Sequence, residues 1–377
     1  MRLVVINALS ARQGGGVTNV INLLSNLIFE NVQVLVLTNS DNHSYFKTFN
    51  SSNIRYFNTK WPSKGLIQRL IWEMFFLNKI LLRLKASIYY NVGGTLLART
   101  PAGCTGITTL QNMLPFSPEE LKRYPLTNLL RYKLIFLRFV YIYSYRNVDK
   151  IAFSSHYSCD TVSKYLSLKN IDYTVIPNGV NELFYDQELI ERKQNVVSGS
   201  DYYLYVSTFD YYKAQLELVK EWATLVKGGF KFRLILIGHN SNDYKGKVIE
   251  LICKLQLEDF VSVLNPVDHF DLPSVYANSR ALIFASSCEC GPNVLSEMMT
   301  SRKLIFCSNY GPMPEFGLDS LLYFDPYVKN DLSDKILAAE NNGEVVNSKL
   351  ADKSWEYSQN HKASVNTALL TKFILGG

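Results

Sequence analysis

Residues 284–315, FASSCECGPNVLSEMMTSRKLIFCSNYGPMPE, hold the pattern that decides the fold. An apolar run at 281–285 ends in a polar stretch, Gly291 and Pro292 then form a turn, and Asn293 can cap a helix. A second apolar run, at 304–307, ends in another Gly/Pro turn. Strand, turn, helix and strand form one α/β unit, and such sheets bind ligands at the carboxyl ends of their strands. We therefore predict an α/β fold with a ligand site where these two strands end.

Two carboxylates, Glu289 and Glu297, flank the predicted turn and the start of the helix. Free N–H groups at a helix start bind phosphate, whereas carboxylates accept hydrogen bonds from sugar hydroxyls. Taken singly, Glu289 fits a loop charge and Glu297 an ordinary exposed helix residue. Taken together around a phosphate site, they favour a nucleotide that carries sugars on both sides.

Length and composition predict two globular domains. The 377 residues exceed one compact core, and 47% hydrophobic with 19% charged residues is typical of a globular protein. The sequence IPNGV at 176–180 breaks regular structure. We expect an N-terminal domain over residues 1–176 and a second domain over residues 177–352.

Cysteine and histidine usage points to a cytoplasmic protein. Six cysteines in so long a chain do not form a disulfide framework, and the five histidines show no metal-ligand spacing. His156 is the one candidate for an active-site histidine, and a capping or loop role is the simpler interpretation. The N-terminus does not resemble a signal peptide, and no uncharged apolar run reaches the ~18 residues that span a bilayer.

Charge is divided unevenly between the two halves of the chain. Residues 1–175 hold 20 Lys and Arg against 8 Asp and Glu, whereas residues 176–377 hold 19 against 25. Segments 66–90 and 119–147 alternate apolar or aromatic residues with basic ones, as interfacial helices on anionic lipid do. The alternative is a pair of helices packed on a sheet with a solvated basic face. An anionic partner is expected: a membrane surface, a phosphate-bearing acceptor or nucleic acid.

The N-terminal half contains two further strand-end loops. Gly14, Gly15 and Gly16 follow a predicted strand and would let a ligand approach the backbone, although a tight turn explains them equally well. They lack the spacing of a dinucleotide-binding fingerprint. A second strand runs into Gln111 and Asn112. Both loops are therefore candidate ligand contacts.

Residues 284–315 resemble the retaining nucleotide-sugar glycosyltransferases of family 4, which have the GT-B fold. The residues that carry the resemblance are Glu289, Gly291, Pro292, Asn293, Leu295, Glu297, Met298, Cys307, Ser308, Asn309, Gly311, Pro312, Pro314 and Glu315. It implies two Rossmann-like domains that face a central cleft. It also implies a C-terminal helix, here 353–377, that crosses back onto the N-terminal domain.

The resemblance also assigns roles to residues. Glu289 would contact the donor sugar, Glu297 the ribose hydroxyls, and the backbone around Asn293 the diphosphate. The implied donor-binding residues are Gly15, Gly16, Thr208, Lys213, Gly238, Pro292, Asn293, Val294, Leu295 and Glu297, with Glu289 and Gln111 as catalytic candidates. The chain departs from the family twice: Gln111 stands where many members have His, and Thr208 stands where an Arg often accompanies the diphosphate-binding lysine.

These patterns predict a glycosyltransferase that moves a sugar from a GDP- or UDP-sugar to a hydroxyl of a saccharide acceptor. By family habit the acceptor would be polyprenyl-diphosphate-linked, in O-antigen or lipopolysaccharide assembly on the inner membrane surface. No cofactor is expected, and no divalent metal, because no Asp-x-Asp motif ends a strand. The alternatives are a nucleotide-sugar epimerase, a glycogen-type phosphorylase or a basic nucleic-acid-binding protein. The acidic second half and the missing recognition motifs disfavour the last.

Overall fold

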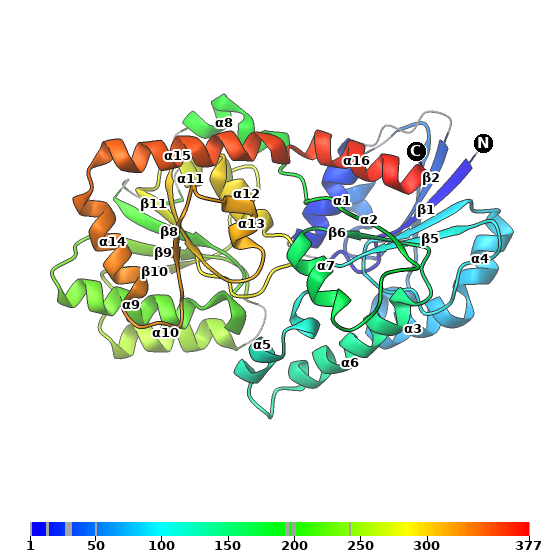
Figure 1. The fold of residues 1–377 in the computed structure, drawn as a ribbon, viewed down its shortest axis with the longest axis horizontal. Coiled ribbons are helices and arrows are strands. Elements are labelled where there is room, and N and C mark those ends of the chain that lie inside the picture. Colours follow the sequence, from blue (N-terminus) through cyan, green and yellow to red (C-terminus); the bar gives the residue numbers. More distant parts are fainter. Residues whose placement is uncertain are drawn as a thin grey trace. The chain divides into compact units, whose positions relative to one another are not determined.

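The computed structural model describes residues 2–12, 15–26, 32–49, 51–192, 196–197, 199, 201–240 and 243–376. The chain divides into two compact units (Figure 1). The first unit comprises Met1–Leu121, Pro125–Gly179 and Ala363–Gly377, and the second comprises Lys122–Tyr124 and Val180–Lys362. At the linker between the two units, the boundary follows Gly179, three residues beyond the expected boundary at 176.

A parallel sheet forms the centre of the first unit. Within the described residues its seven strands run in the order β3-β2-β1-β4-β5-β6-β7. The strands are β1 (Arg2–Asn7), β2 (Val32–Thr38), β3 (Ile54–Asn58), β4 (Ile88–Asn91), β5 (Thr105–Thr109), β6 (Lys150–Phe153) and β7 (Asp172–Val175). The chain order reverses between β1 and β4, which is the switch point where such sheets bind ligands.

Helices pack around this sheet and position the loops at its strand ends. They are α1 (Gly15–Ser25), α2 (His43–Phe46), α3 (Leu66–Phe75), α4 (Leu77–Leu84), α5 (Pro118–Arg123), α6 (Leu129–Tyr145), α7 (His156–Ser163) and α16 (Ala363–Leu375), with short 3-10 turns at Pro62–Lys64 and Leu114–Phe116. The long helix α6 begins where the Asn128 side chain accepts a hydrogen bond from the Leu130 N–H. It buries Leu134, Leu137 and Tyr141 along one face.

The second unit repeats this plan. Within the described residues its six parallel strands run in the order β10-β9-β8-β11-β12-β13, and the order reverses between β8 and β11. The strands are β8 (Tyr202–Val206), β9 (Arg233–Ile237), β10 (Val261–Leu264), β11 (Ala281–Phe284), β12 (Leu304–Ser308) and β13 (Leu322–Phe324). All four residues of β11 are buried, as expected for a central parallel strand covered on both faces.

The helices of the second unit follow the same alternation. They are α8 (Gln187–Glu191), α9 (Gln215–Lys227), α10 (Tyr244–Lys254), α11 (Leu272–Ala277), α12 (Asn293–Met299), α13 (Met313–Gly317), α14 (Asp331–Asn341) and α15 (Glu344–Ser358), with 3-10 turns at Glu182–Tyr185, Tyr211–Lys213 and Gln359–His361. The expectation that Asn293 caps α12 is wrong. Pro292 occupies the cap position and Asn293 is the first helical residue, because the chain turns helical directly after the proline.

The C-terminal segment is two helices where the sequence predicted one over 353–377. Helix α15 belongs to the second unit and α16 to the first. Between them Lys362 is extended, and the His361 carbonyl accepts a hydrogen bond of 2.7 Å from the Val180 N–H. The break arises because this segment pairs with the linker, where it can no longer continue a helix.

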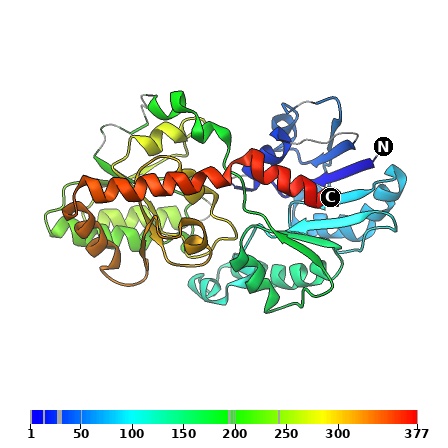
Figure 2. The same cartoon turned by 45° about the horizontal axis from the view of Figure 1, so that its top comes forward.

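Helix α16 completes the first unit. Ile374 packs in the same core as Val4 and Ile6, and Thr367 Oγ1 donates a hydrogen bond of 3.3 Å to the Asn22 carbonyl on α1. Figure 2 shows the C-terminus beside the N-terminal strand, where Arg2 donates to the Leu375 carbonyl. The last helix therefore belongs to the fold of the first unit.

The apolar segment 66–90 also differs from the single helix that was expected. Its helical part divides into α3 and α4 at Phe76, whose φ of −116° departs from helical geometry. Phe76 is exposed, and its ring packs edge-on against Trp61 with centroids 6.1 Å apart. Both helices carry exposed apolar side chains, among them Ile71 on α3 and Leu82 on α4.

A buried carboxylate lies beneath α3. Glu73 is fully buried, and its Oε1 accepts hydrogen bonds from Asn91 at 3.2 Å and from Thr95 at 3.0 Å. Its Oε2 has no hydrogen-bond partner among the described residues. Burial raises the pKa of Glu73 to about 7, against the opposing effects of the Arg69 charge and these two hydrogen bonds.

We predict that Glu73 makes the stability of the fold depend on pH. Glu73 holds its proton more tightly in the folded chain, so the free energy of unfolding falls as pH rises from 4.5 to about 7. The wild type should lose about 3 kcal/mol relative to Glu73→Gln across this interval. Gln keeps the Oε1 acceptor, so denaturant unfolding of both proteins at pH 4.5 and pH 8 isolates the ionisation. An equal pH dependence in the two proteins would contradict the raised pKa.

Candidate functional site

An ion pair lies at the switch point of the second unit. Lys213 ends the 3-10 turn that follows β8, and Glu289 lies in the loop that follows β11. Lys213 Nζ donates to Glu289 Oε1, and the two side chains are only 9% and 16% exposed. Because β8 and β11 are neighbouring parallel strands, their carboxyl ends bring together two residues that are 76 positions apart in the sequence.

Hydroxyl and aromatic groups hold this pair in place. Ser286 Oγ donates to Glu289 Oε1 at 2.6 Å, and Lys213 Nζ lies 4.8 Å from the centre of the Tyr212 ring. The Tyr212 backbone carbonyl in turn accepts from the N–H of Ser287 at 2.8 Å. Removing either charge would leave the other buried and uncompensated, which costs about 3–5 kcal/mol in buried pairs.

Glu297 has a partner of its own. It lies on α12, is buried, and its Oε1 is 3.3 Å from His269 Nε2. Burial lowers the pKa of His269, but the hydrogen bond and charge of Glu297, with Asp268, outweigh burial and raise it above the ordinary value. The edge of Phe184 packs against the imidazole. Glu297 is thus a carboxylate held by a histidine.

The turn and first residues of α12 offer backbone groups more than side chains. Leu295 is wholly buried, and the Asn293 N–H donates to the Gly291 carbonyl at 3.0 Å. Pro292 has no N–H to donate. The N–H groups of Val294 and Leu295 lie in the first helical turn, where no intrahelical acceptor exists. Since α12 has only seven residues, its dipole adds little to what these N–H groups provide.

Gly238 has a structural reason for being glycine. A Cβ at this position would lie 1.7 Å from the backbone oxygen of Ser207, so β9 and the loop after β8 approach too closely for any side chain. The Thr208 carbonyl accepts a hydrogen bond of 2.9 Å from Gln215. Thr208 and Gly238 therefore shape the loop that carries Lys213.

The sequence marked residues 119–147 as aromatic and basic but did not predict that part of this segment belongs to the second unit. Lys122–Tyr124 belongs to the second unit, although it lies in the N-terminal half of the sequence. The Arg123 guanidinium lies 3.3 Å from the centre of the Tyr327 ring, and the Tyr327 hydroxyl is 2.9 Å from Ser287 Oγ. Tyr124 donates to Asp210 at 2.8 Å, which fixes the segment beside the loop of Lys213. Arg123 thus brings a second cation to a region where Thr208 replaces the expected arginine.

The role of His269 as a partner of Glu297 was also missed, because nothing in the sequence links the two residues. His269 and Glu297 are far apart in sequence, and no motif joins them. His156, the histidine that the sequence singled out, is the first residue of α7 and is exposed. Ser155 provides the helix cap, so the expected capping role belongs to its neighbour.

The first unit contains a cavity of about 480 Å³ at its own switch point. It is lined by the loop after β1, the ends of β4 and β5, and helices α1, α3, α6 and α16. Among the predicted residues, Gly16 and Gln111 line it. Gly15 is not among the lining residues, and Gly14 lies outside the described residues.

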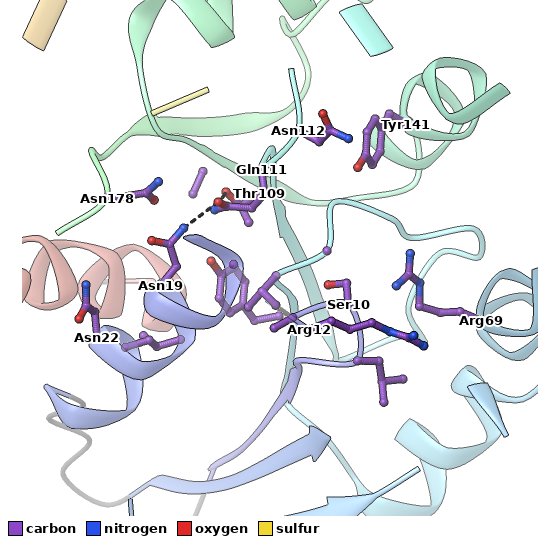
Figure 3. Close-up of a pocket in the computed structure, with 18 of the residues that line it drawn as sticks. Ser10, Arg12, Asn19, Asn22, Arg69, Thr109, Gln111, Asn112, Tyr141 and Asn178 are labelled. Carbon is purple, nitrogen blue, oxygen red and sulfur yellow. Dashed lines mark hydrogen bonds between the residues drawn. The ribbon is translucent and has the colours of Figure 1, made fainter. Parts of the chain in front are cut away.

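Amide and cationic groups dominate the polar lining of this cavity. Figure 3 shows Asn19, Gln111 and Asn178 on one side, with Asn19 Nδ2 donating to Gln111 Oε1 at 2.7 Å. Arg12 and Arg69 lie on the other side, beside Ser10. Lys133 of α6 also lines the cavity. No Asp or Glu is among the described residues that line it, so the cavity favours an anionic or hydroxyl-rich ligand.

The two arginines differ in how far they are engaged. Arg12 donates to the Ser63 carbonyl and lies 3.9 Å from Asp41. The buried Nε of Arg69 has no hydrogen-bond partner among the residues that the structure describes. Because Arg69 lines the cavity, its guanidinium is a candidate contact for an anionic ligand there.

The described residues offer neither a cluster of metal ligands nor a helix able to span a membrane. Across that part of the chain, no three His, Cys, Asp or Glu side chains gather as a metal site would require. No helix there has both the length and the apolar character needed to cross a membrane. Independence of metal ions remains a prediction.

Comparison with known families and structures extends these observations. Residues 186–360 match the family described as glycosyl transferases group 1, and residues 13–182 match glycosyltransferase family 4. No curated protein sequence matches the chain. The chain is therefore built of two glycosyltransferase domains, which places it among the glycosyltransferases.

Solved structures share its fold over the whole chain. A sucrose-phosphate synthase from Thermosynechococcus elongatus has a TM-score of 0.79 at 15% identity and covers 100% of this chain and 99% of its own. HepE of Anabaena in complex with UDP-glucose has a TM-score of 0.75 at 16% identity, covering 100% of both chains. A glycosyltransferase from Rickettsia africae gives 0.70 at 18%, covering 99% and 98%. These likenesses confirm the predicted GT-B fold.

The contact between His269 and Glu297 yields a prediction that needs no substrate. NMR titration should place the pKa of His269 above 6.5 in the wild type, and Glu297→Gln should lower it because burial then meets less opposition. The raised pKa stabilises the fold fully below pH 6.5, and this stabilisation disappears as pH rises through the folded value. An unchanged His269 titration in Glu297→Gln would show that the two groups do not interact.

Proposed function

We propose that the protein is a retaining glycosyltransferase that transfers a sugar from a nucleoside-diphosphate sugar, carrying UDP or GDP, to a hydroxyl of a saccharide acceptor. The observation that supports this most strongly is the Lys213–Glu289 pair at the switch point of a glycosyltransferase group 1 domain. The HepE structure, similar in fold, is a complex with UDP-glucose. A cation beside a carboxylate suits a donor whose phosphates and sugar hydroxyls are neighbours.

The donor would redistribute the contacts of this pair. A diphosphate competes with Glu289 for Lys213 Nζ, because both are anionic acceptors for the same N–H groups. Glu289, once relieved of the lysine, can accept hydrogen bonds from the donor sugar. Glu297 would accept from ribose hydroxyls, with His269 fixing its orientation. The donor would thereby exchange one internal ion pair for two contacts to itself.

The chemical step needs stabilisation of the departing diphosphate. Charge develops on its oxygens as the glycosidic bond breaks, and Lys213 with the N–H groups of Val294 and Leu295 would stabilise that charge. The proton of the acceptor hydroxyl can pass to the departing phosphate, and the hydroxyl would then attack from the face that the diphosphate leaves. Glu289 positions the sugar in this scheme and forms no covalent bond.

The acceptor is assigned to the first unit. Its cavity presents amide groups, Gln111 among them, that can bind saccharide hydroxyls, and cations that can bind an attached phosphate. A polyprenyl-diphosphate-linked saccharide combines both features. We place the enzyme in the cytoplasm on the inner, anionic membrane surface, in cell-surface polysaccharide assembly such as O-antigen. The excess of Lys and Arg over Asp and Glu in residues 1–175 supports contact with anionic lipid.

The first functional prediction concerns Lys213. In a panel of UDP- and GDP-sugars, one donor should release nucleoside diphosphate, and the transferred sugar should keep its anomeric configuration. Lys213→Ala should slow the release of nucleoside diphosphate by about 100-fold or more. Lys353→Ala is the matched control, since Lys353 forms an exposed ion pair with Asp319 in the same unit. Its rate should equal that of the wild type.

Loss of folding must be separated from loss of chemistry. The double variant Lys213→Met with Glu289→Gln removes both buried charges and should unfold at a temperature close to that of the wild type, yet remain inactive. An epimerised nucleotide sugar without release of nucleoside diphosphate would contradict transfer and favour the epimerase. Full activity of Lys213→Ala would refute the assigned role.

The second functional prediction concerns metal ions. Transfer should proceed at the same rate in excess EDTA as with added Mg²⁺ or Mn²⁺, because Lys213 and backbone N–H groups would neutralise the diphosphate. The measurement is the initial rate after exhaustive dialysis against chelator. A rate that falls in EDTA and returns with Mn²⁺ would show that a divalent cation shares this task.

A further inference from the structure

The first unit carries an apolar groove between two helices. The groove has a volume of about 370 Å³ and is lined by α3, α6 and the loop after β4. Its lining residues are Leu70, Ile71, Met74, Leu97, Phe136, Phe139, Val140 and Tyr143. None of them is charged. Helices α3 and α6 lie side by side at this position (Figure 1).

The walls of the groove are unusually exposed for side chains of this kind. Phe139 is 62% exposed, and Ile71, Met74, Phe136 and Tyr143 are exposed as well. Contiguous apolar side chains that face solvent mark a binding surface, since leaving them in water forfeits the free energy of burial. A ligand that covers them must itself be apolar along its length.

The same two helices also line the cationic cavity. On α3, Arg69 lines the cavity and the next residue, Leu70, lines the groove. On α6, Lys133 lines the cavity, and Phe136, less than one turn further, lines the groove. A polar, cationic site and a wholly apolar site thus share two supporting helices.

Charge selects the kind of ligand that can use both sites. Helix α6 contains Arg131, Lys133 and Arg138 and no acidic residue. On α3 the one acid, Glu73, is buried and turned into the core network. Arg69 lines the cavity and brings a guanidinium to it. The two helices together hold four cations and one acid, so their net charge favours an anion.

We propose that the cavity and the groove together bind one amphiphile, with its anionic head at Arg69 and Lys133 and its single apolar chain along the α3–α6 groove. This inference rests on the proposed function, for which it identifies the lipid-binding part of the acceptor site. It assigns the exposed side chains of the groove to one chain of a bound lipid, in preference to the acyl region of an intact bilayer. The saccharide of the acceptor would then extend toward Gln111.

The test uses dodecyl phosphate below the concentration at which it forms micelles, with binding to the whole protein measured by calorimetry. The probe needs no donor, so its result is independent of whether sugar transfer occurs. Met74→Asp combined with Phe139→Asp should weaken binding by about tenfold or more, because a carboxylate in an apolar site is poorly solvated. Leu82→Asp is the control: Leu82 is exposed to a similar extent on α4 but does not line the groove.

The head group is tested separately. Arg69→Gln should weaken dodecyl phosphate binding, and dodecyl trimethylammonium should bind about tenfold more weakly than dodecyl phosphate. Since Met74 and Phe139 are exposed, their substitution should leave thermal unfolding unchanged, which the same samples can show. Equal binding by both amphiphiles would overturn the assignment of the head to the cavity.

Two outcomes would overturn the groove itself. One is binding of dodecyl phosphate by the groove variant that equals binding by the wild type. The other is an absence of dodecyl phosphate binding together with flotation of the wild type, and not of the groove variant, on anionic vesicles. The second result would identify the surface as a bilayer-docking face.

Discussion

The Lys213–Glu289 ion pair is the contact on which the candidate donor site of the second unit depends. Each residue follows one of the two strands that flank the reversal of strand order, so the pair exists only when β8 and β11 are neighbours in the correct register. Because both side chains are largely buried, the loss of either charge would leave the other uncompensated, which costs free energy. It also makes the pair responsive, because an incoming anion offers Lys213 an alternative partner. Lys213 is therefore buried and paired in the structure, yet it can bind an anionic ligand by exchanging Glu289 for it.

Backbone proximity provides the same control at the base of the site. The carbonyl of Ser207 occupies the space that a Cβ of residue 238 would need, so the loop that leads to Lys213 can lie close to β9 only beside glycine. Gly179 acts similarly in the first unit, where a Cβ would come within 2.4 Å of the Cα of Ala363. In both places a residue without a side chain lets two backbone segments lie close together. This close contact fixes the position of the neighbouring loop or helix.

The strands and the alternation of the fold could be predicted because they are local. Apolar runs bounded by Gly/Pro turns placed β11 and β12 within a residue of their observed ends. The breaks at Phe76 and Lys362 were missed because neither position carries a proline or glycine, and both depend on tertiary contacts. His269 and Arg69 were missed for the same reason: one meets Glu297 only through the folded sheet, and the other lines a cavity assembled from segments far apart in the sequence. Gly15, Thr208, Pro292 and the other donor-binding residues remain predictions.

The charged groups at the candidate sites of the two units differ. The described lining of the first-unit cavity contains cations and amides and no carboxylate, so its electrostatic preference is for an anion or a neutral hydroxylated ligand. The second unit presents carboxylates that are each already matched, Glu289 by Lys213 and Glu297 by His269. A matched carboxylate can accept a hydroxyl without the repulsion that a bare one would exert on a nearby phosphate. The charges of the second unit therefore suit a ligand that alternates phosphates with sugars, whereas those of the first suit an anionic or a hydroxylated ligand.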